Sequence, residues 1–225
     1  MKNALVPALC VALAAWSSTG VAQEKKRDEF YWLGQINKAS LVINTEQGLI
    51  DKALAPRFAQ GIAQVIADGD KEGGKRPSTV ITFEPLMIKA AGEEITLLHA
   101  GRSSQDMHAT YRAAILRDDL LALAEQLHRT TSTLVDLAQK HAGTIVPNYT
   151  NGVAAQPNSY GHYLLGHVAG LRRDAQRIRE AYARVDRSAM GTTVLNGTSW
   201  PLDRERMARY LGFAATVENA YDASQ

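Results

Sequence analysis

The chain has 225 residues, of which 45% are hydrophobic, 21% charged and 7% aromatic. This is the composition of a soluble globular protein, and it excludes a disordered, collagen-like or disulfide-scaffold chain. The 25 Lys and Arg residues nearly balance the 23 Asp and Glu residues, which leaves a net charge of +2. Charge alone therefore gives no reason to expect binding to nucleic acid or to anionic lipid.

Residues 1–22 have the pattern of a secretory signal peptide. Lys2 supplies a positive start, an apolar run follows over residues 4–16, and small residues end at Ala22. The apolar run is shorter than the ~20 residues that a membrane-spanning helix needs. We expect a periplasmic or secreted protein with no membrane segment after cleavage. The only cysteine, Cys10, would be removed with the signal peptide, which excludes disulfides and cysteine-ligated zinc.

The first part of the expected mature chain is helical by its pattern. Apolar residues recur at three- and four-residue steps over residues 30–67, which predicts two helices separated near Pro56. Glycine and charged residues over 68–78 predict a surface loop. Residues 79–86 begin like a strand, but a helix over 84–91 fits equally well.

Two long helices dominate the second part of the sequence. Apolar residues recur at helical spacing over 104–141 without Pro or Gly, and Ser103 or Ser104 is a candidate N-cap. A second long helix is predicted over 158–186. A shorter helix is expected between Pro201 and Gly212, and another one after Phe213.

Helices of this length do not bury their own apolar faces. We therefore predict an all-α chain that either packs against other subunits or lacks further helices. Its expected parts are a small N-terminal helical domain at residues 23–103 and the long helices of a truncated central helical bundle at residues 104–225.

The sequence contains partial patterns of a phosphate-binding loop and of a histidine metal site, and neither is complete. Residues 69–75 have the glycine and lysine spacing of a phosphate-binding loop, but Arg76 replaces the required Ser or Thr, and acidic residues within the loop would repel phosphate. The closest histidines along the second long helix, His162 and His167, face different sides of that helix. We expect no nucleotide site, no metal site and no cofactor.

Three polar loops lie beside the ends of the long helices, at residues 101–106, 147–157 and 191–198. Each combines small hydroxyl and amide side chains with a helix terminus, where exposed N–H groups favour an anion. Such loops can hold a carboxylate without a metal. Ordinary helix capping is the alternative explanation for each loop taken alone.

Together, the three loops resemble the argininosuccinate lyase and fumarase (aspartase) superfamily. Residues 100–106, Ala-Gly-Arg-Ser-Ser-Gln-Asp, are similar to its first signature, Gly-Arg-Ser-Arg-Asn-Asp-Gln in argininosuccinate lyases. Residues 147–157 resemble the second, usually Pro-Gly-Tyr-Thr-His-Leu-Gln-Arg-Ala-Gln-Pro. Residues 184–204 are similar to the stretch that follows. The resemblance covers the N-terminal and partial central region of the family.

The resemblance implies a homotetramer in which three subunits build each active site. It implies β-elimination of fumarate from an N-succinyl (amino-dicarboxylate) substrate, a small dicarboxylate. The residues that would bind substrate are Ser103, Ser104, Gln105, Thr150 and Gln156. Thr150 and Asn151 occupy the positions of a catalytic Thr-His pair, but the amide of Asn151 cannot exchange a proton near neutral pH.

The family's third signature carries the base serine and a carboxylate-binding lysine, and it would lie beyond Gln225. We therefore expect this chain alone to be inactive, whether it is a fragment, a split gene product or a natural short form. Two alternatives remain open. One is a noncatalytic truncated helical module for binding or assembly. The other is a cycloisomerase or adenylosuccinate lyase-type relative.

Overall fold

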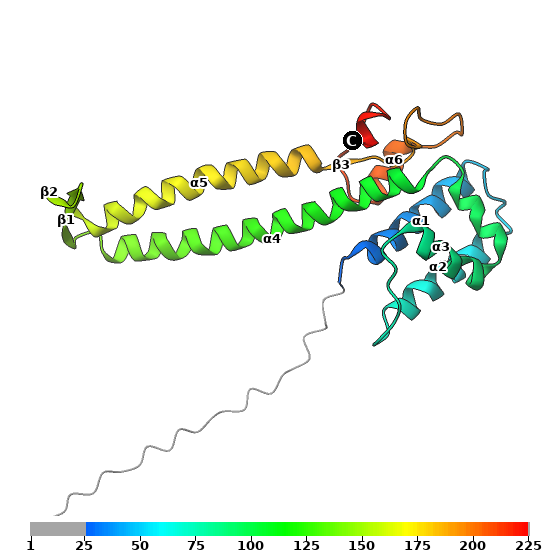
Figure 1. Cartoon of the computed structure of the whole chain (residues 1–225), viewed down its shortest axis with the longest axis horizontal. Helices are drawn as coiled ribbons and strands as arrows, with labels where there is room; N and C mark the ends of the chain where they lie inside the picture. Colours follow the sequence, from blue (N-terminus) through cyan, green and yellow to red (C-terminus); the bar gives the residue numbers. More distant parts are fainter. Residues whose placement is uncertain (1–25, 225) are drawn as a thin grey trace, which may run out of the picture.

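The computed structural model describes residues 26–224, and helices dominate it (Figure 1). The elements are α1 (Glu29–Glu46), α2 (Ala55–Gly69), α3 (Val80–Ala91), the 3₁₀ helix η1 (Glu93–His99), α4 (Ser104–Lys140), β1 (Ile145–Thr150), β2 (Val153–Ser159), α5 (Tyr160–Val185), β3 (Arg187–Ser188), α6 (Arg204–Tyr210), β4 (Ala215–Thr216) and the 3₁₀ helix η2 (Asp222–Ser224). The all-α prediction is confirmed. The predicted signal peptide lies outside the described residues. Within them, no helix combines the length and hydropathy of a membrane span.

Helices α1 to α3 form a compact group at one end of the molecule (Figure 1). The predicted pair of helices over residues 30–67 is confirmed as α1 and α2, with the break at residues 47–54, just before Pro56. Pro56 lies in the first turn of α2, where its missing N–H costs nothing, and the link between the helices precedes it.

The strand-like residues 79–86 are helical. Thr79 caps α3 by accepting a hydrogen bond from the Thr82 N–H. Val80, Phe83 and Met87 then follow at helical spacing and are all buried. Tertiary burial of this face outweighs the strand preference of the β-branched residues.

Helices α4 and α5 form a long antiparallel pair that extends away from the compact group (Figure 1). Helix α4 has 37 residues, which makes it about 55 Å long at 1.5 Å per residue. Leu121 and Leu123 on α4 are each 54% exposed. The pair therefore leaves apolar side chains open to solvent, as expected for helices taken from a larger bundle.

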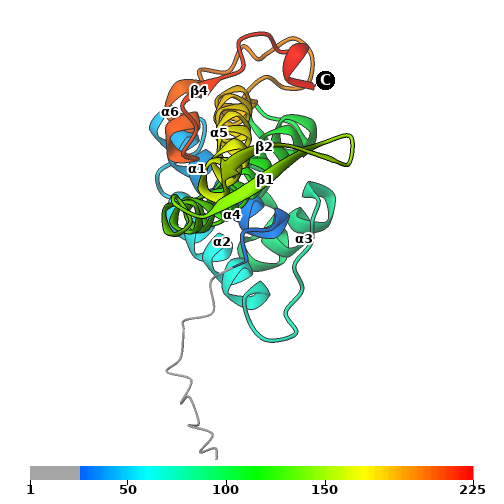
Figure 2. The same cartoon turned by 90° about the vertical axis from the view of Figure 1, so that its left-hand side faces the viewer.

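The two long helices are joined at their far end by the hairpin of β1 and β2, which faces the viewer in Figure 2. Asn151 and Gly152 form its two-residue turn with φ of 49° and 77°, and Thr150 pairs with Val153. Positive φ at both positions is the type I′ geometry for which Asn-Gly is preferred. The expected polar loop over 147–157 is thus an ordered hairpin.

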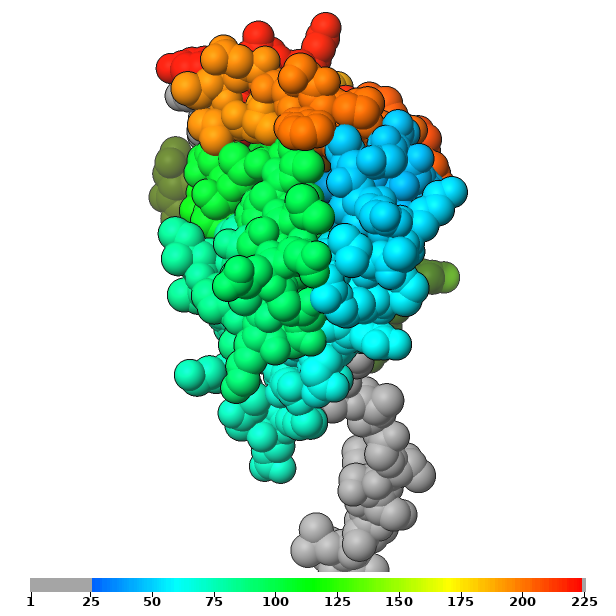
Figure 3. Space-filling view, turned by 90° about the vertical axis from the view of Figure 1, so that its right-hand side faces the viewer, coloured from blue at the N-terminus to red at the C-terminus, as the bar shows by residue number. Residues whose placement is uncertain are grey.

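The C-terminal segment returns to the compact group. Figure 3 shows its orange part lying across the green segment around the start of α4 and the cyan-blue segment that follows α1. Met190, Met207, Leu211 and Phe213 join the same buried core as α1 to α3. The core therefore draws on residues from both sides of the domain boundary predicted at residue 103, and that boundary stays a prediction.

The helix predicted after Phe213 is wrong. This segment forms β4, which pairs in parallel with β3, and ends in η2. The backbone of this segment bonds to other elements of the chain. For example, the Val217 N–H donates to the Ser188 carbonyl at 2.9 Å. The Arg204 guanidinium donates to the Val217 carbonyl at 2.7 Å. The helix expected between Pro201 and Gly212 is confirmed only as the shorter α6.

Candidate functional site

The first polar loop turns sharply into α4. Gly101 has φ of 73°, and a Cβ there would clash with the side chain of Leu202. Ser103 is the N-cap, because its Oγ accepts from the Asp106 N–H at 3.3 Å. The Ser103 N–H donates to Asp106 Oδ1 at 3.0 Å, which completes a capping box.

This cap leaves Ser104 and Gln105 in the first turn of a long helix, and both are half-buried. Within residues 26–224, no protein acceptor bonds the backbone N–H groups of Ser104 and Gln105. These orphan donors, with the positive end of the helix dipole, favour an anion at this point. Ser104 and Gln105 thus lie at a helix start that suits an anion, and their role in binding a carboxylate stays a prediction.

The buried carboxylate of Asp106 joins the first polar loop to the third. Its Oδ2 accepts from the Gly191 N–H at 3.0 Å and from the Thr193 N–H at 3.1 Å. Burial raises the pKa of Asp106, against the opposing effects of the N–H donors from Ser103 and Thr193 and of the nearby Arg102. The first and third loops therefore form one connected unit.

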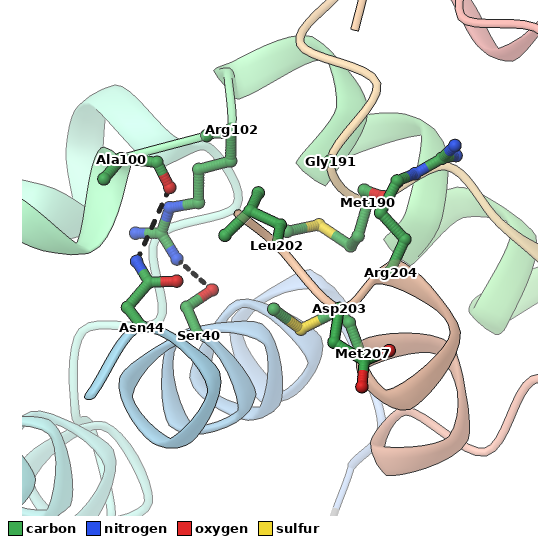
Figure 4. A pocket seen from close by; sticks show the side chains of 11 residues that line it. Ser40, Asn44, Ala100, Arg102, Met190, Gly191, Leu202, Asp203, Arg204 and Met207 are labelled. Atoms are coloured by element: carbon green, nitrogen blue, oxygen red, sulfur yellow. Dashed lines mark hydrogen bonds between the residues drawn. The ribbon is translucent and has the colours of Figure 1, made fainter. Parts of the chain in front are cut away.

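Arg102 fixes the same unit to α1 (Figure 4). Its guanidinium donates to Ser40 Oγ at 2.7 Å, the bond drawn in Figure 4. It also donates to Asn37 Oδ1 at 2.7 Å. Burial lowers the pKa of Arg102 to about 10, so it stays cationic at neutral pH. The hollow beside these residues in Figure 4 measures only about 10 Å³, enough for about one water molecule. It supports the loop rather than holding substrate.

The second polar loop carries Thr150, Asn151 and Gln156 on the exposed hairpin. Thr150 and Gln156 line a hollow of about 940 Å³, together with Asn148, Tyr160 and Tyr163. No charged side chain among the described residues lines this hollow. Asn151, at the predicted histidine position, forms the hairpin turn instead.

The structure brings the predicted site residues together only in part. Ser103, Ser104 and Gln105 lie at the start of α4, while Thr150 and Gln156 lie beyond its end. The length of α4 places these two groups about 55 Å apart within one chain. Within one chain these two groups of residues therefore do not meet.

Sequence reasoning missed the roles of Asp106, Arg102, Gly191 and Thr193. The capping-box pattern, with an acid three residues after Ser103, was a usable signal for Asp106. The contacts of Arg102 reach 62 and 65 residues back along the chain, and no local pattern indicates them. Within the described part of the chain, no group of three or more His, Cys, Asp or Glu residues is placed to hold a metal ion.

The chain is similar to known proteins. A family model described as a lyase matches residues 50–225. The argininosuccinate lyase of Methanosarcina barkeri is 33% identical over 190 residues, which are 84% of this chain and 39% of that protein. The chain thus spans about two fifths of the length of this curated relative.

Solved structures agree with this match. An EDDS lyase variant with bound fumarate has a TM-score of 0.82 and 32% identity, covering 87% of this chain and 39% of that one. The β-carboxy-cis,cis-muconate cycloisomerase of Acinetobacter calcoaceticus sp. ADP1 has a TM-score of 0.68 at 18% identity, covering 87% of this chain and 48% of that one. This second likeness shows the fold alone. The chain belongs to the matched lyase family and lies within the fumarate lyase superfamily.

Proposed function

We propose that the chain is part of an argininosuccinate lyase-like enzyme that cleaves a carbon–nitrogen bond by β-elimination and releases fumarate from an N-succinyl substrate. The observation that carries the proposal is the start of α4. Ser104 and Gln105 there present unbonded N–H groups beside their polar side chains, on a loop fixed by Asp106. The similarity to argininosuccinate lyase and EDDS lyase sequences supports the same reaction.

The chemistry follows from the charge that develops. Removal of the proton next to a carboxylate produces a dianionic intermediate, which fixed hydrogen-bond donors stabilise. Ser103, Ser104 and Gln105 would hold one carboxylate at the helix N-terminus. Thr150 and Gln156, from another copy, would add donors from the hairpin. A homotetramer would bring these groups together, and fumarate lyases are generally oligomeric.

Asn151 would not act as the acid, because its amide does not titrate near neutral pH. The base serine belongs to a signature that residues 26–224 do not contain. We therefore propose that this chain releases fumarate only together with a polypeptide that supplies that signature. The pattern of residues 1–22 supports export, so the substrate would be an amino-dicarboxylate outside the cytoplasm.

The test is fumarate release, followed by ultraviolet absorbance, from residues 23–225 with argininosuccinate. The chain is assayed alone and mixed with the part of the Methanosarcina barkeri enzyme that follows the matched region. Release by the mixture only is the expected result. The variant Gln105→Ala in the same mixture should lower the rate, whereas Gln176→Ala on the exposed side of α5 should not.

Other outcomes separate the alternatives. Release by residues 23–225 alone would place the base within this chain and contradict the expected inactivity. Binding of fumarate with no release in either assay would favour the noncatalytic binding module. Turnover of a muconate, with no fumarate from argininosuccinate, would favour the cycloisomerase alternative.

A further inference from the structure

A second hollow, of about 830 Å³, runs along α4 from Gln105. Its floor is the face of α4 that carries Gln105, Ala109 and Arg112. Its opposite walls come from the end of α5, from β3 and from the C-terminal segment. We call this hollow the arginine groove, because Arg112, Arg184 and Arg187 line it.

The cations of the arginine groove have no acidic partner among the described residues, although Arg112 also bonds the side chain of Tyr111 beside it. Arg112, Arg184 and Arg187 are exposed, and none of them forms an ion pair with another described residue. By contrast, Arg117 further along α4 is buried, pairs with Asp186 and lies 3.8 Å over the ring of Phe213. Arg117 thus has an acidic partner within the fold, whereas the charges of Arg112, Arg184 and Arg187 have none among the described residues.

The groove also contains acidic groups on its far side. Glu218 and Asp222 line it from the C-terminal segment, and neither forms an ion pair with a described residue. A ligand that carries both an anion and a cation matches this distribution of charge. The hollow at the hairpin has no charged lining, so the two hollows favour different chemical groups.

The distance between Gln105 and Arg112 along α4 indicates how long a ligand that reaches both residues must be. Gln105 and Arg112 are seven residues apart and therefore lie on one helix face, about 10 Å from each other. Ala109 lies between them, and its short side chain leaves the floor of the groove open. A molecule bound through a carboxylate at Gln105 would therefore extend over Ala109 toward Arg112.

We infer that the arginine groove binds the amine half of the substrate and that Arg112 selects amines bearing a carboxylate. This inference rests on the proposed function, because it takes the succinyl half to lie at Ser104 and Gln105. Arg112 would pair with the carboxylate, with Arg184 and Arg187 adding positive charge. Glu218 and Asp222 would face the cationic nitrogen of the amine. A guanidinium suits this role, because it binds a carboxylate through two parallel hydrogen bonds.

The test measures binding to residues 23–225 by isothermal titration calorimetry. The probes are argininosuccinate, its analogue in which hydrogen replaces the carboxylate of the arginine part, and fumarate. Argininosuccinate should bind about tenfold more tightly than the analogue, the size expected for one charge-assisted hydrogen bond. Arg112→Gln should abolish this difference, and the matched control Arg172→Gln on exposed α5 should preserve it. Thermal melting by circular dichroism verifies that each variant is folded.

Three results would overturn the inference. The first is that argininosuccinate does not bind. The second is that argininosuccinate and its analogue bind equally tightly. The third is that the difference in affinity between them remains in Arg112→Gln. The binding of fumarate tests the site at Ser104 and Gln105 separately from the arginine groove. Absence of fumarate binding would count against the proposed function, whereas fumarate binding without discrimination at Arg112 would overturn the arginine groove alone.

Discussion

Asp106 and Thr193 are 87 residues apart in the sequence, yet the Asp106 carboxylate accepts a hydrogen bond from the Thr193 N–H at 3.1 Å. Thr193 and the following Val194 have φ of 48° and 76°, a conformation that is costly for β-branched residues. The bond to Asp106 helps to offset this cost. The loop that follows α5 is therefore held in a strained shape against the start of α4.

The first prediction concerns this bond. Asp106→Asn keeps the shape of the side chain but can turn its NH₂ group toward the N–H donors of Gly191 and Thr193, which leaves buried polar groups unpaired. The free energy of unfolding should fall by about 2 kcal/mol. Urea denaturation followed by circular dichroism measures it. Asp136→Asn on the exposed part of α4 is the control, and an equal effect of both substitutions would contradict a special role for Asp106.

The second prediction concerns pH. Burial lowers the pKa of His99, with a further contribution from the nearby positive charge of Arg102, while Glu84 at 2.8 Å acts in the opposite direction. Below pH 6.5 the unfolded chain takes up a proton that the folded chain resists. His99 therefore reduces the stability as the pH falls from 6.5 toward its lowered pKa.

Urea denaturation at pH 7.5 and pH 5.5 tests this effect. The wild-type chain should lose stability at the lower pH, and His99→Gln should lose less. His162→Gln, at an exposed position on α5, should behave like the wild type. If His99→Gln loses as much stability as the wild type, the loss comes from other groups.

The third prediction concerns Arg117. Its guanidinium pairs with Asp186, donates to the Leu211 carbonyl at 3.4 Å and stacks on Phe213, so it joins α4 to the end of α5 and to the C-terminal segment. Arg117→Met removes the charge and leaves these acceptors unpaired. The expected loss in the free energy of unfolding is about 3–5 kcal/mol, measured by urea denaturation.

Arg129→Met gives the control, because Arg129 pairs with Glu125 only on the exposed surface of α4. A surface pair of this kind contributes about 1 kcal/mol or less. Equal losses for the two substitutions would show that the buried position of Arg117 adds nothing.

Features with a local cause could be predicted from the sequence. The periodicity of α4 and α5 and the cap at Ser103 depend on neighbouring residues, and all three are confirmed. Residues 79–86 and the segment after Phe213 could not be predicted, because distant partners decide them. Val80, Phe83 and Met87 become helical in a buried core, and Val217 finds its acceptor on Ser188.

The candidate site follows the same rule. The motif around Ser104 and Gln105 predicted an anion site at a helix start, because the relevant donors belong to consecutive residues. The separation of Thr150 from Gln105 follows from the length of α4, the unbroken helix that lies between them and that the periodicity also predicted. The arginine groove joins residues from α4, α5 and the C-terminal segment, so no single stretch of sequence indicates it.

The last prediction concerns Asn151, which forms the hairpin turn with Gly152 at φ of 49° and 77°. Asn151→Ala should loosen the hairpin, because a backbone with positive φ costs alanine about 1–2 kcal/mol. Asn151→Gly should keep the turn, since glycine adopts positive φ without strain. Hydrogen exchange followed by mass spectrometry should then show faster exchange over residues 145–159 in Asn151→Ala than in Asn151→Gly.

The same two variants separate a turn residue from a substrate contact. If Asn151 acts through the turn, Asn151→Gly should release fumarate at the wild-type rate when mixed with the complementing polypeptide, although it lacks the side chain. Asn151→Ala should be slower only to the extent that the hairpin is loosened. Comparable losses in both variants would show instead that the Asn151 amide contacts the substrate at the position where the family places its histidine.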